Sequence, residues 1–185
     1  MEIEKVEVID NKITSILSRT RLITAIQFTA LLAIAVFAPI SNNQIITGSL
    51  VNATLFIAAA ILGLEGAILI ALLPSSFALL FGTLPMALAP LVPFIILSNI
   101  LLVLFVVSFK NDSKWWVFPS AAIIKFLFLF STSIWAIELL FHGSLVKTAS
   151  VMFSWPQLVT ALIGGAIALV LIKKSANMRL YDNRK

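Results

Sequence analysis

Residues 22–40 read LITAIQFTALLAIAVFAPI, a run that contains no charged side chain. A transmembrane helix needs roughly 20 consecutive, mainly apolar residues, so this stretch predicts one. The whole chain has the same character, because 61% of its 185 residues are hydrophobic and only 11% are charged. Soluble domains have about 45–50% apolar and about 25% charged residues. The sequence therefore predicts an all-α integral membrane protein and excludes a water-soluble enzyme.

Further apolar runs follow, and together with the first they predict a bundle of about six transmembrane helices. The expected spans are residues 22–40, 46–62, 66–81, 93–109, 116–140 and 156–172. The second and third are short, so tilt or local thinning of the bilayer must make up their length. Residues 82–92 are apolar too, but they contain Pro85 and Pro90. We expect a hydrophobic loop or a half-buried segment there rather than a helix.

The distribution of basic residues predicts the orientation, because Lys and Arg are retained on the cytoplasmic side. They precede the first span, separate the fourth from the fifth and follow the sixth: Lys5, Lys12, Arg19, Arg21, Lys110, Lys114, Lys173, Lys174, Arg179, Arg184 and Lys185. Only Lys147 falls on the other side, and Lys125 lies within a span. Both termini are therefore expected in the cytoplasm, in a multi-pass protein of the cell (inner or plasma) membrane.

The same pattern divides the chain into three parts. Residues 1–21 predict a cytoplasmic segment, in which apolar residues recur at near-helical spacing from Ile3 to Ile16 and suggest an amphipathic helix. Residues 22–172 form the six-helix membrane domain, and residues 173–185 form a basic cytoplasmic tail. The net charge of +5 then reflects topology, so the lipid bilayer is the expected partner of these charges and nucleic acid is not.

The residues that catalysis and metal binding need are scarce. The chain has no cysteine and one histidine, His142, which excludes disulfides, thiolate nucleophiles and Cys-ligated iron–sulfur or zinc sites. No nucleophile elbow and no phosphate-binding loop occur, so the chain cannot hydrolyse ATP by itself. We expect no enzyme activity, no cofactor and no metal site.

Lys125 and Asn99 stand out among the polar residues inside predicted spans, where burial without a partner is expensive. The long stem of Lys125 either lets its ammonium reach the cytoplasmic headgroups or places it in the interior, where it neutralises a carboxylate of the protein or of a ligand. Asn99 lies in the outer half of the fourth span. An interhelical hydrogen bond is the commonest use of such an asparagine, and the wall of a pocket is the other.

The fifth helix carries a polar stripe at spacing i, i+4, i+7 and i+11, made up of Ser131, Trp135, Glu138 and His142. This spacing places all four on one face, either as an interfacial belt or as one wall of a polar pocket that opens outward. Asn52, Trp155 and Gln157 also lie near the outer ends of their spans. Since polar groups gather in the outer half, we expect a small-molecule site there, with residues 82–92 as its lid.

Three stretches resemble a known family. Residues 29–33 read TALLA, which is similar to the small-residue A-A-x-x-A motif of its first helix, with threonine in the first place. Residues 82–99, GTLPMALAPLVPFIILSN, resemble its third loop and the start of its fourth helix, and residues 156–174 resemble its closing helix. The family is the substrate-binding S component of energy-coupling-factor (ECF) transporters, and the resemblance covers residues 24–174.

This resemblance implies a capture subunit that binds a small water-soluble solute, such as a vitamin, and works with a transmembrane coupling subunit and ATPase subunits. The residues expected to bind the solute are Asn99, Lys125, Trp135, Glu138, His142, Trp155 and Gln157. Thr29, Ala30 and Ala33 would dock the coupling subunit, because small residues let helices approach closely. Ala33 departs from the family pattern by lying toward the middle of its span. No N-terminal histidine cluster is present, so a metal cargo is not expected.

Two other functions compete with solute capture. One is a structural or assembly subunit of a membrane complex that binds no ligand. In that case Ala30→Leu abolishes association, while Trp135→Ala and Asn99→Ala have no effect. The other is an intramembrane enzyme that uses Glu138 and His142, which are an i, i+4 pair.

Overall fold

The computed structural model describes residues 2–109, 115–140 and 144–182, and these residues form helices and turns without a strand. In chain order the helices are α1 (Glu2–Phe37), η1 (Ala38–Ser41), α2 (Gln44–Ile61), α3 (Gly63–Leu80), η2 (Met86–Leu91), α4 (Val92–Ser108), α5 (Val117–Leu140), α6 (Ser144–Met152) and α7 (Trp155–Asp182), where η denotes a 3₁₀ helix. The predicted all-α class is thereby confirmed for this part of the chain.

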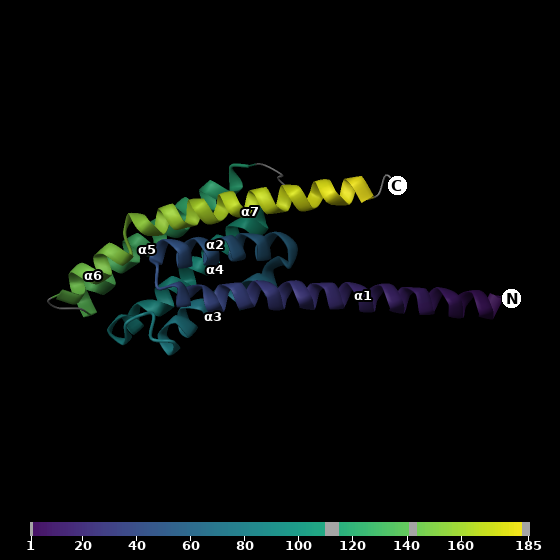
Figure 1. Ribbon diagram of the computed structural model, residues 1–185, viewed down its shortest axis with the longest axis horizontal. Coiled ribbons are helices and arrows are strands. Elements are labelled where there is room, and N and C mark those ends of the chain that lie inside the picture. Colours follow the sequence, from purple (N-terminus) through teal and green to yellow (C-terminus); the bar gives the residue numbers. More distant parts are fainter. Residues whose placement is uncertain (1, 110–114, 141–143, 183–185) are drawn as a thin grey trace.

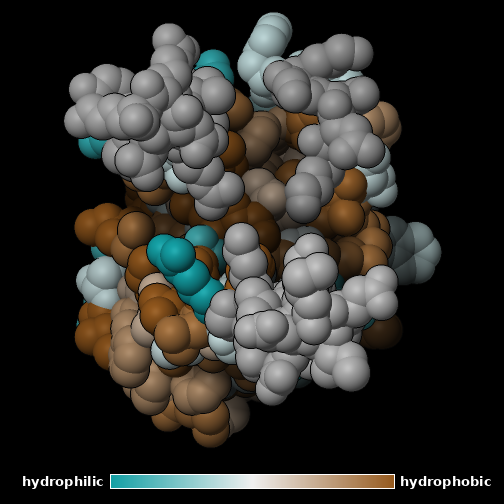
Figure 2. Space-filling model, turned by 90° about the vertical axis from the view of Figure 1, so that its right-hand side faces the viewer, coloured by the Kyte–Doolittle hydropathy of each residue, from teal (hydrophilic) through white to brown (hydrophobic). Residues whose placement is uncertain are grey.

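Six segments of the described chain are long and apolar enough to cross a membrane, as the sequence predicts. They are Ile16–Ser41, Gln44–Ile61, Gly63–Leu80, Leu88–Ser108, Val117–Leu139 and Ala149–Ser175. Large apolar side chains such as Leu69, Leu127 and Val170 are exposed on the flanks of the bundle. Figure 2, which looks from the end where the termini lie, shows this hydrophobic flank in brown. A multi-pass membrane protein accounts for so much exposed apolar surface.

The outer helices run well past the spans at one end of the molecule. α1 continues without a break from residue 2 through Arg19 and Arg21 into its apolar part, and α7 extends to Asp182. Both ends of the chain lie on the same side of the bundle, at the right of Figure 1. The α1–α2 turn, η2 and α6 lie at the opposite end.

The segment at residues 82–92 is only partly as expected. Leu84, Leu88 and Leu91 are buried, which confirms a half-buried segment. The expectation that it contains no helix is wrong, because η2 occupies residues 86–91. A 3₁₀ helix tolerates this sequence because it is short, and the carbonyl of Pro85 accepts a hydrogen bond from the amide of Leu88 at 2.8 Å.

Two apolar clusters form the core, one above the other along the bundle. The cluster nearer the termini includes Leu55, Val103 and Ala122. The cluster at the other end is built from η2, α4, α5, α6 and the α6–α7 junction, and its members on α5 are Leu129, Ala136 and Ile137. Lys125 falls between Ala122 and Leu129 on the same helix, so a polar layer separates the two clusters.

α2 is the central helix and packs along α7, with further contacts to α1, α3 and α4. The approach to α7 depends on Gly164, where a Cβ atom would lie 2.7 Å from the backbone nitrogen of Ala53 and 2.7 Å from Cβ of Asn52. Ala161 and Ala168 on the same helix are fully buried. Small residues thus bring the two backbones together and place Asn52 against α7.

Candidate binding site

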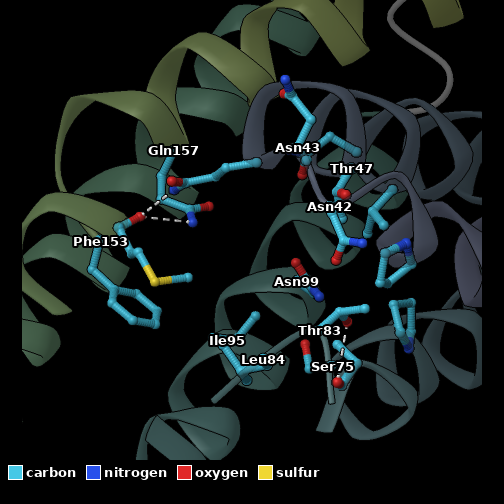
Figure 3. Close-up of a pocket in the computed structure, with 18 of the residues that line it drawn as sticks. Asn42, Asn43, Thr47, Ser75, Thr83, Leu84, Ile95, Asn99, Phe153 and Gln157 are labelled. Atoms are coloured by element: carbon cyan, nitrogen blue, oxygen red, sulfur yellow. Dashed lines mark hydrogen bonds between the residues drawn. The ribbon is translucent and has the colours of Figure 1, made fainter. Parts of the chain in front are cut away.

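A cavity of about 260 Å³ opens at the end of the bundle away from the termini. Its walls come from the α1–α2 junction, α2, α3, the residues before η2, α4, α5, the α6–α7 junction and the start of α7. Figure 3 shows Phe153 and Gln157 on one side, across from Asn42 and Ser75, with Asn99 between the two sides. The site therefore joins segments that are far apart in the sequence.

The mouth of the cavity is built by the polar turn between α1 and α2. Asn43 caps α2, because its Oδ1 accepts hydrogen bonds from the amides of Ile45 at 3.0 Å and Ile46 at 3.1 Å. Asn42 has a left-handed backbone with φ of 50°, a conformation that asparagine tolerates better than most residues. Both asparagines are exposed and both line the cavity.

One wall is held by a single backbone carbonyl. The carbonyl oxygen of Met152 accepts a hydrogen bond from Nε2 of Gln44 at 2.7 Å and another from Nε2 of Gln157 at 3.1 Å. These two bonds tie the start of α2 to the junction of α6 and α7. Phe153 contributes an aromatic side chain to the same wall.

The opposite wall is formed by the second half of α3 and the turn that follows it. Pro74, which lies inside α3, lines the cavity together with Ser75. Proline has no amide proton, so one helical hydrogen bond is missing at this turn. Thr83 also lines the cavity, and its hydroxyl donates to the carbonyl of Ala78 at 3.1 Å. This wall therefore offers hydroxyl oxygens beside apolar surface.

The floor of the cavity is the polar layer around Lys125, whose side chain is only 3% exposed. Its ammonium donates hydrogen bonds to Oδ1 of Asn52 and to Oδ1 of Asn99, the latter at 2.7 Å. The Nδ2 of Asn52 donates to Oγ1 of Thr160 at 3.4 Å, and the Nδ2 of Asn99 donates to the carbonyl of Ala71 at 3.5 Å. The network joins α2, α3, α4, α5 and α7.

The floor holds a buried lysine without an acidic partner among the described lining residues. None of the described lining residues is an aspartate or a glutamate. Glu65 and Glu138 are exposed and lie outside the lining. Within the described part of the chain, no group of three His, Cys, Asp or Glu residues could hold a metal ion. The partners of Lys125 in the protein are two neutral amide oxygens.

The structure brings together three of the residues that the sequence singles out. Asn99, Lys125 and Gln157 all line the cavity, and Lys125 faces the interior instead of reaching the headgroups. Trp135 is 82% exposed and Trp155 is 65% exposed, so neither contributes to the cavity wall. Their expected place in the pocket, like that of Glu138, is not what the structure shows, and His142 lies outside the described residues.

The polar stripe on α5 points away from the bundle. The buried face that contains Lys125 continues through Leu129, Ser133 and Ala136. With 3.6 residues per turn, Trp135 and Glu138 fall on the other side of the helix. The spacing predicts which residues share a face, but it does not say which face turns inward.

On α1, Thr29 and Ala30 are exposed and Ala33 is partly exposed. These three residues therefore lie on accessible surface of α1, outside the cavity lining. Association with another subunit at this surface stays a prediction.

Sequence reasoning missed several residues of the site. Thr47, Ser75 and Thr83 line the cavity, and Thr160 supports it from α7. Asn52, which the sequence places among the polar groups of the outer half but not among the expected binding residues, lines the cavity too. Asn52 carries the clearest signal, because it is an amide inside an apolar span, as Asn99 is. The serine and threonines give no comparable signal, since their hydroxyls commonly bond to the preceding turn of their own helix.

Comparisons of the chain with protein-family models, with curated proteins and with solved structures give no match. The functional argument therefore depends on the residues of this chain and their geometry. The feature that any function must explain is a cavity at one end of a membrane bundle, with a buried lysine as its floor.

Proposed function

We propose that the chain is the membrane-embedded substrate-capture subunit of an ATP-driven uptake transporter of the ECF type. It binds a small water-soluble solute, such as a vitamin, in a pocket that opens outward. The observation that carries this proposal is the cavity of about 260 Å³ whose floor is the hydrogen-bonded layer of Lys125, Asn52 and Asn99. An inert structural bundle has no need of such a space.

The distribution of charge supports an outward opening. Arg19, Arg21, Lys173 and Lys174 are exposed near the end of the bundle where the termini lie. Basic residues favour the cytoplasmic side, so the opposite end, where the cavity opens, faces the outside. A subunit of the cell membrane with this orientation meets its solute before the solute crosses the bilayer.

The size and lining of the cavity support a small polar solute. Typical ligand pockets measure about 300–1,000 Å³, so this cavity lies just below their range. Its wall combines apolar side chains such as Leu84, Ile95 and Phe153 with amides such as Asn42 and Gln157. Apolar surface with a few placed polar groups is the usual composition of a small-molecule site.

Energy for uptake must come from other subunits, because the sequence has no phosphate-binding loop. The exposed small residues Thr29 and Ala30 on α1, with Ala33 beside them, offer a surface that another helix can approach closely. In this proposal the transmembrane coupling subunit packs there and the ATPase subunits bind beneath it.

Native mass spectrometry of the detergent-purified chain tests solute capture directly. A stoichiometric adduct of small-molecule mass is expected on the wild type. Ala78 lines the cavity, so Ala78→Trp fills it and should remove the adduct. Ala166 is exposed on α7, so Ala166→Trp adds the same side chain outside the cavity and should keep the adduct. An adduct that survives Ala78→Trp contradicts binding in this cavity.

A second candidate, a structural subunit without a ligand, is favoured by one observation. The bonds of Lys125 to Asn52 and Asn99 join helices of the same chain, which is what an interhelical staple does. This candidate gains support if the purified wild type shows no adduct and a panel of vitamins leaves its melting temperature unchanged. Association lost in Ala30→Leu would then identify its role.

A further inference from the structure

We propose that the captured solute carries one carboxylate, and that this group binds at the floor of the cavity next to the ammonium of Lys125. The inference rests on the proposed function and names the chemical class of the solute. It follows from the burial of Lys125, from the number of its donors, and from the absence of an acidic partner among the described residues around it.

The position of Lys125 makes an unpaired charge costly. The side chain is 3% exposed and sits between the two apolar clusters, and its helix neighbours Ala121, Ala122 and Leu129 are fully buried. A buried cation is stable when an anion and further hydrogen bonds compensate for the water it has lost. The amide oxygens of Asn52 and Asn99 supply hydrogen bonds but no negative charge.

An ammonium group has three N–H donors. In the described structure two of them have acceptors, Oδ1 of Asn52 and Oδ1 of Asn99. Lys125 also lines the cavity, so its remaining donor can reach a group placed there. A carboxylate oxygen in that position completes the hydrogen bonding of the ammonium and neutralises its charge with one contact.

No acid in the described part of the packed helices can take this role. Of α2, α3, α4 and residues 155–175 of α7, only α3 brings an acidic residue, Glu65, which is exposed in its first turn and does not line the cavity. Asp182 is the last residue of α7, at the end of that helix away from the cavity. On α5 itself, Glu138 is exposed and also outside the lining. The countercharge therefore has to come with the solute.

The charge balance selects a carboxylate over a phosphate. Lys125 is the one charged side chain among the described lining residues, so the floor supplies a single positive charge. A phosphate monoester carries about −1.5 to −2 at neutral pH and would leave negative charge uncompensated in an apolar bundle. A carboxylate carries one charge, and the amides of Asn42 and Gln157 remain for the polar groups of the rest of the solute.

The test uses probes that differ in charge and little else. The pairs are nicotinate with nicotinamide, biotin with biotinamide, and pantothenate with panthenol. Each probe is added to the full chain in detergent, melting is followed by tryptophan fluorescence, and dissociation constants are measured by calorimetry for the probes that raise the melting temperature. The proteins are the wild type, Lys125→Met and, as the matched control, Lys147→Met, which removes an exposed lysine of α6.

We expect at least one acid to bind about tenfold more tightly than its neutral partner, because an ion pair with the ammonium replaces a hydrogen bond to a neutral acceptor. This preference should persist in Lys147→Met and disappear in Lys125→Met. A neutral partner that binds as tightly as its acid overturns the inference but leaves solute capture standing. If no probe of either kind stabilises the wild type and no adduct copurifies, solute capture itself fails.

A second variant keeps the test valid if Lys125→Met does not fold. Asn99→Asp retains the lysine and places a carboxylate where the 2.7 Å bond now has an amide oxygen. The charge is then neutralised within the chain, so the preference for acids should be lost although the cavity keeps its shape. An acid preference that remains in Asn99→Asp contradicts the role given to Lys125.

Discussion

The ammonium nitrogen of Lys125 lies 2.7 Å from Oδ1 of Asn99, so a buried cation on α5 is held by a neutral amide on α4. A second amide, that of Asn52, accepts from the same ammonium across the bundle. Because α2, α4 and α5 meet at this one atom, the network sets the depth at which the cavity ends. It also makes the bundle sensitive to the charge of the groups around it.

Asn99→Asp should stabilise the protein in the absence of solute. The substitution turns a hydrogen bond between an ammonium and a neutral amide into an ion pair, worth about 1 kcal/mol more, and gives up the long 3.5 Å bond to the carbonyl of Ala71. For a chain of this size this corresponds to a melting temperature about 2–4 °C higher. Calorimetry or tryptophan fluorescence of the solute-free protein measures it.

Asn43→Asp is the control for this prediction. It makes the same chemical change at the cap of α2, where aspartate and asparagine are equally good acceptors. Its melting temperature should stay close to that of the wild type. An equal rise in both variants would show that added negative charge, and not its position beside Lys125, is responsible.

Gly164→Ala should destabilise the bundle much more than Gly165→Ala. At Gly164 the new Cβ atom would lie 2.7 Å from the backbone nitrogen of Ala53, which cannot move without shifting α2. At Gly165 the nearest atom is Cε2 of the Phe56 ring at 3.3 Å, which requires a small adjustment. Overpacking of this kind costs about 1–3 kcal/mol.

Thermal unfolding in detergent compares the two alanine variants. The pair is informative because the residues are neighbours and the added group is identical. Similar melting temperatures for both variants would mean that α2 and α7 approach less closely than the structure shows.

Removal of two buried hydroxyls should have opposite effects. The Oγ of Ser49 is buried without a hydrogen-bond partner in the described structure, so Ser49→Ala should leave stability unchanged or raise it by up to about 1 kcal/mol. Thr160 accepts from Asn52 and donates to the carbonyl of Gln157, so Thr160→Val leaves a buried amide unpaired. The valine variant should lose about 1–3 kcal/mol.

Both hydroxyl variants can be compared by their melting temperatures in one detergent. Each substitution keeps a side chain of nearly the same shape, so packing changes little. A stability loss in Ser49→Ala equal to that in Thr160→Val would show that Ser49 has a partner, for instance an ordered water molecule.

The absence of cysteine makes the orientation of the chain easy to measure. Ser41 is exposed at the end of the bundle where the cavity opens, and Ser175 is exposed on the part of α7 near the termini. A membrane-impermeant maleimide added to intact cells should label Ser41→Cys but not Ser175→Cys. Permeabilised cells should show labelling of both, and the reverse pattern in intact cells would place the cavity in the cytoplasm.

The fold is readable from the sequence because the bilayer imposes a length on each helix. Charge-free runs such as residues 22–40 are sufficient to predict six spans. The sequence does not predict the short helix α6, because its nine residues are too few to appear as a membrane span in a hydropathy pattern. The helical spacing from Ile3 to Ile16 suggests a helix in residues 1–21, and α1 is helical there, but the sequence does not predict that this helix continues without a break through Arg19 and Arg21 into the first span.

Part of the binding site can be predicted from the sequence, again because the bilayer restricts which residues a span can contain. Lys125 and Asn99 are conspicuous because polar groups inside an apolar span need partners. The stripe with Trp135 and Glu138 gives a wrong prediction for the cavity wall, because helical periodicity does not indicate which face of a helix turns toward the bundle. Taking Lys125 as the reference gives the buried face, since Leu129, Ser133 and Ala136 follow it at helical spacing.

The order of the polar layer along the chain bears on how the protein enters the membrane during synthesis. Asn52 on α2 and Asn99 on α4 both precede Lys125 on α5. A lysine near the centre of a transmembrane helix costs about 2.5–3.5 kcal/mol on insertion scales. When α5 leaves the ribosome, the two oxygens that receive its ammonium have already been translated. The helix that carries the buried lysine is thus made after its own acceptors.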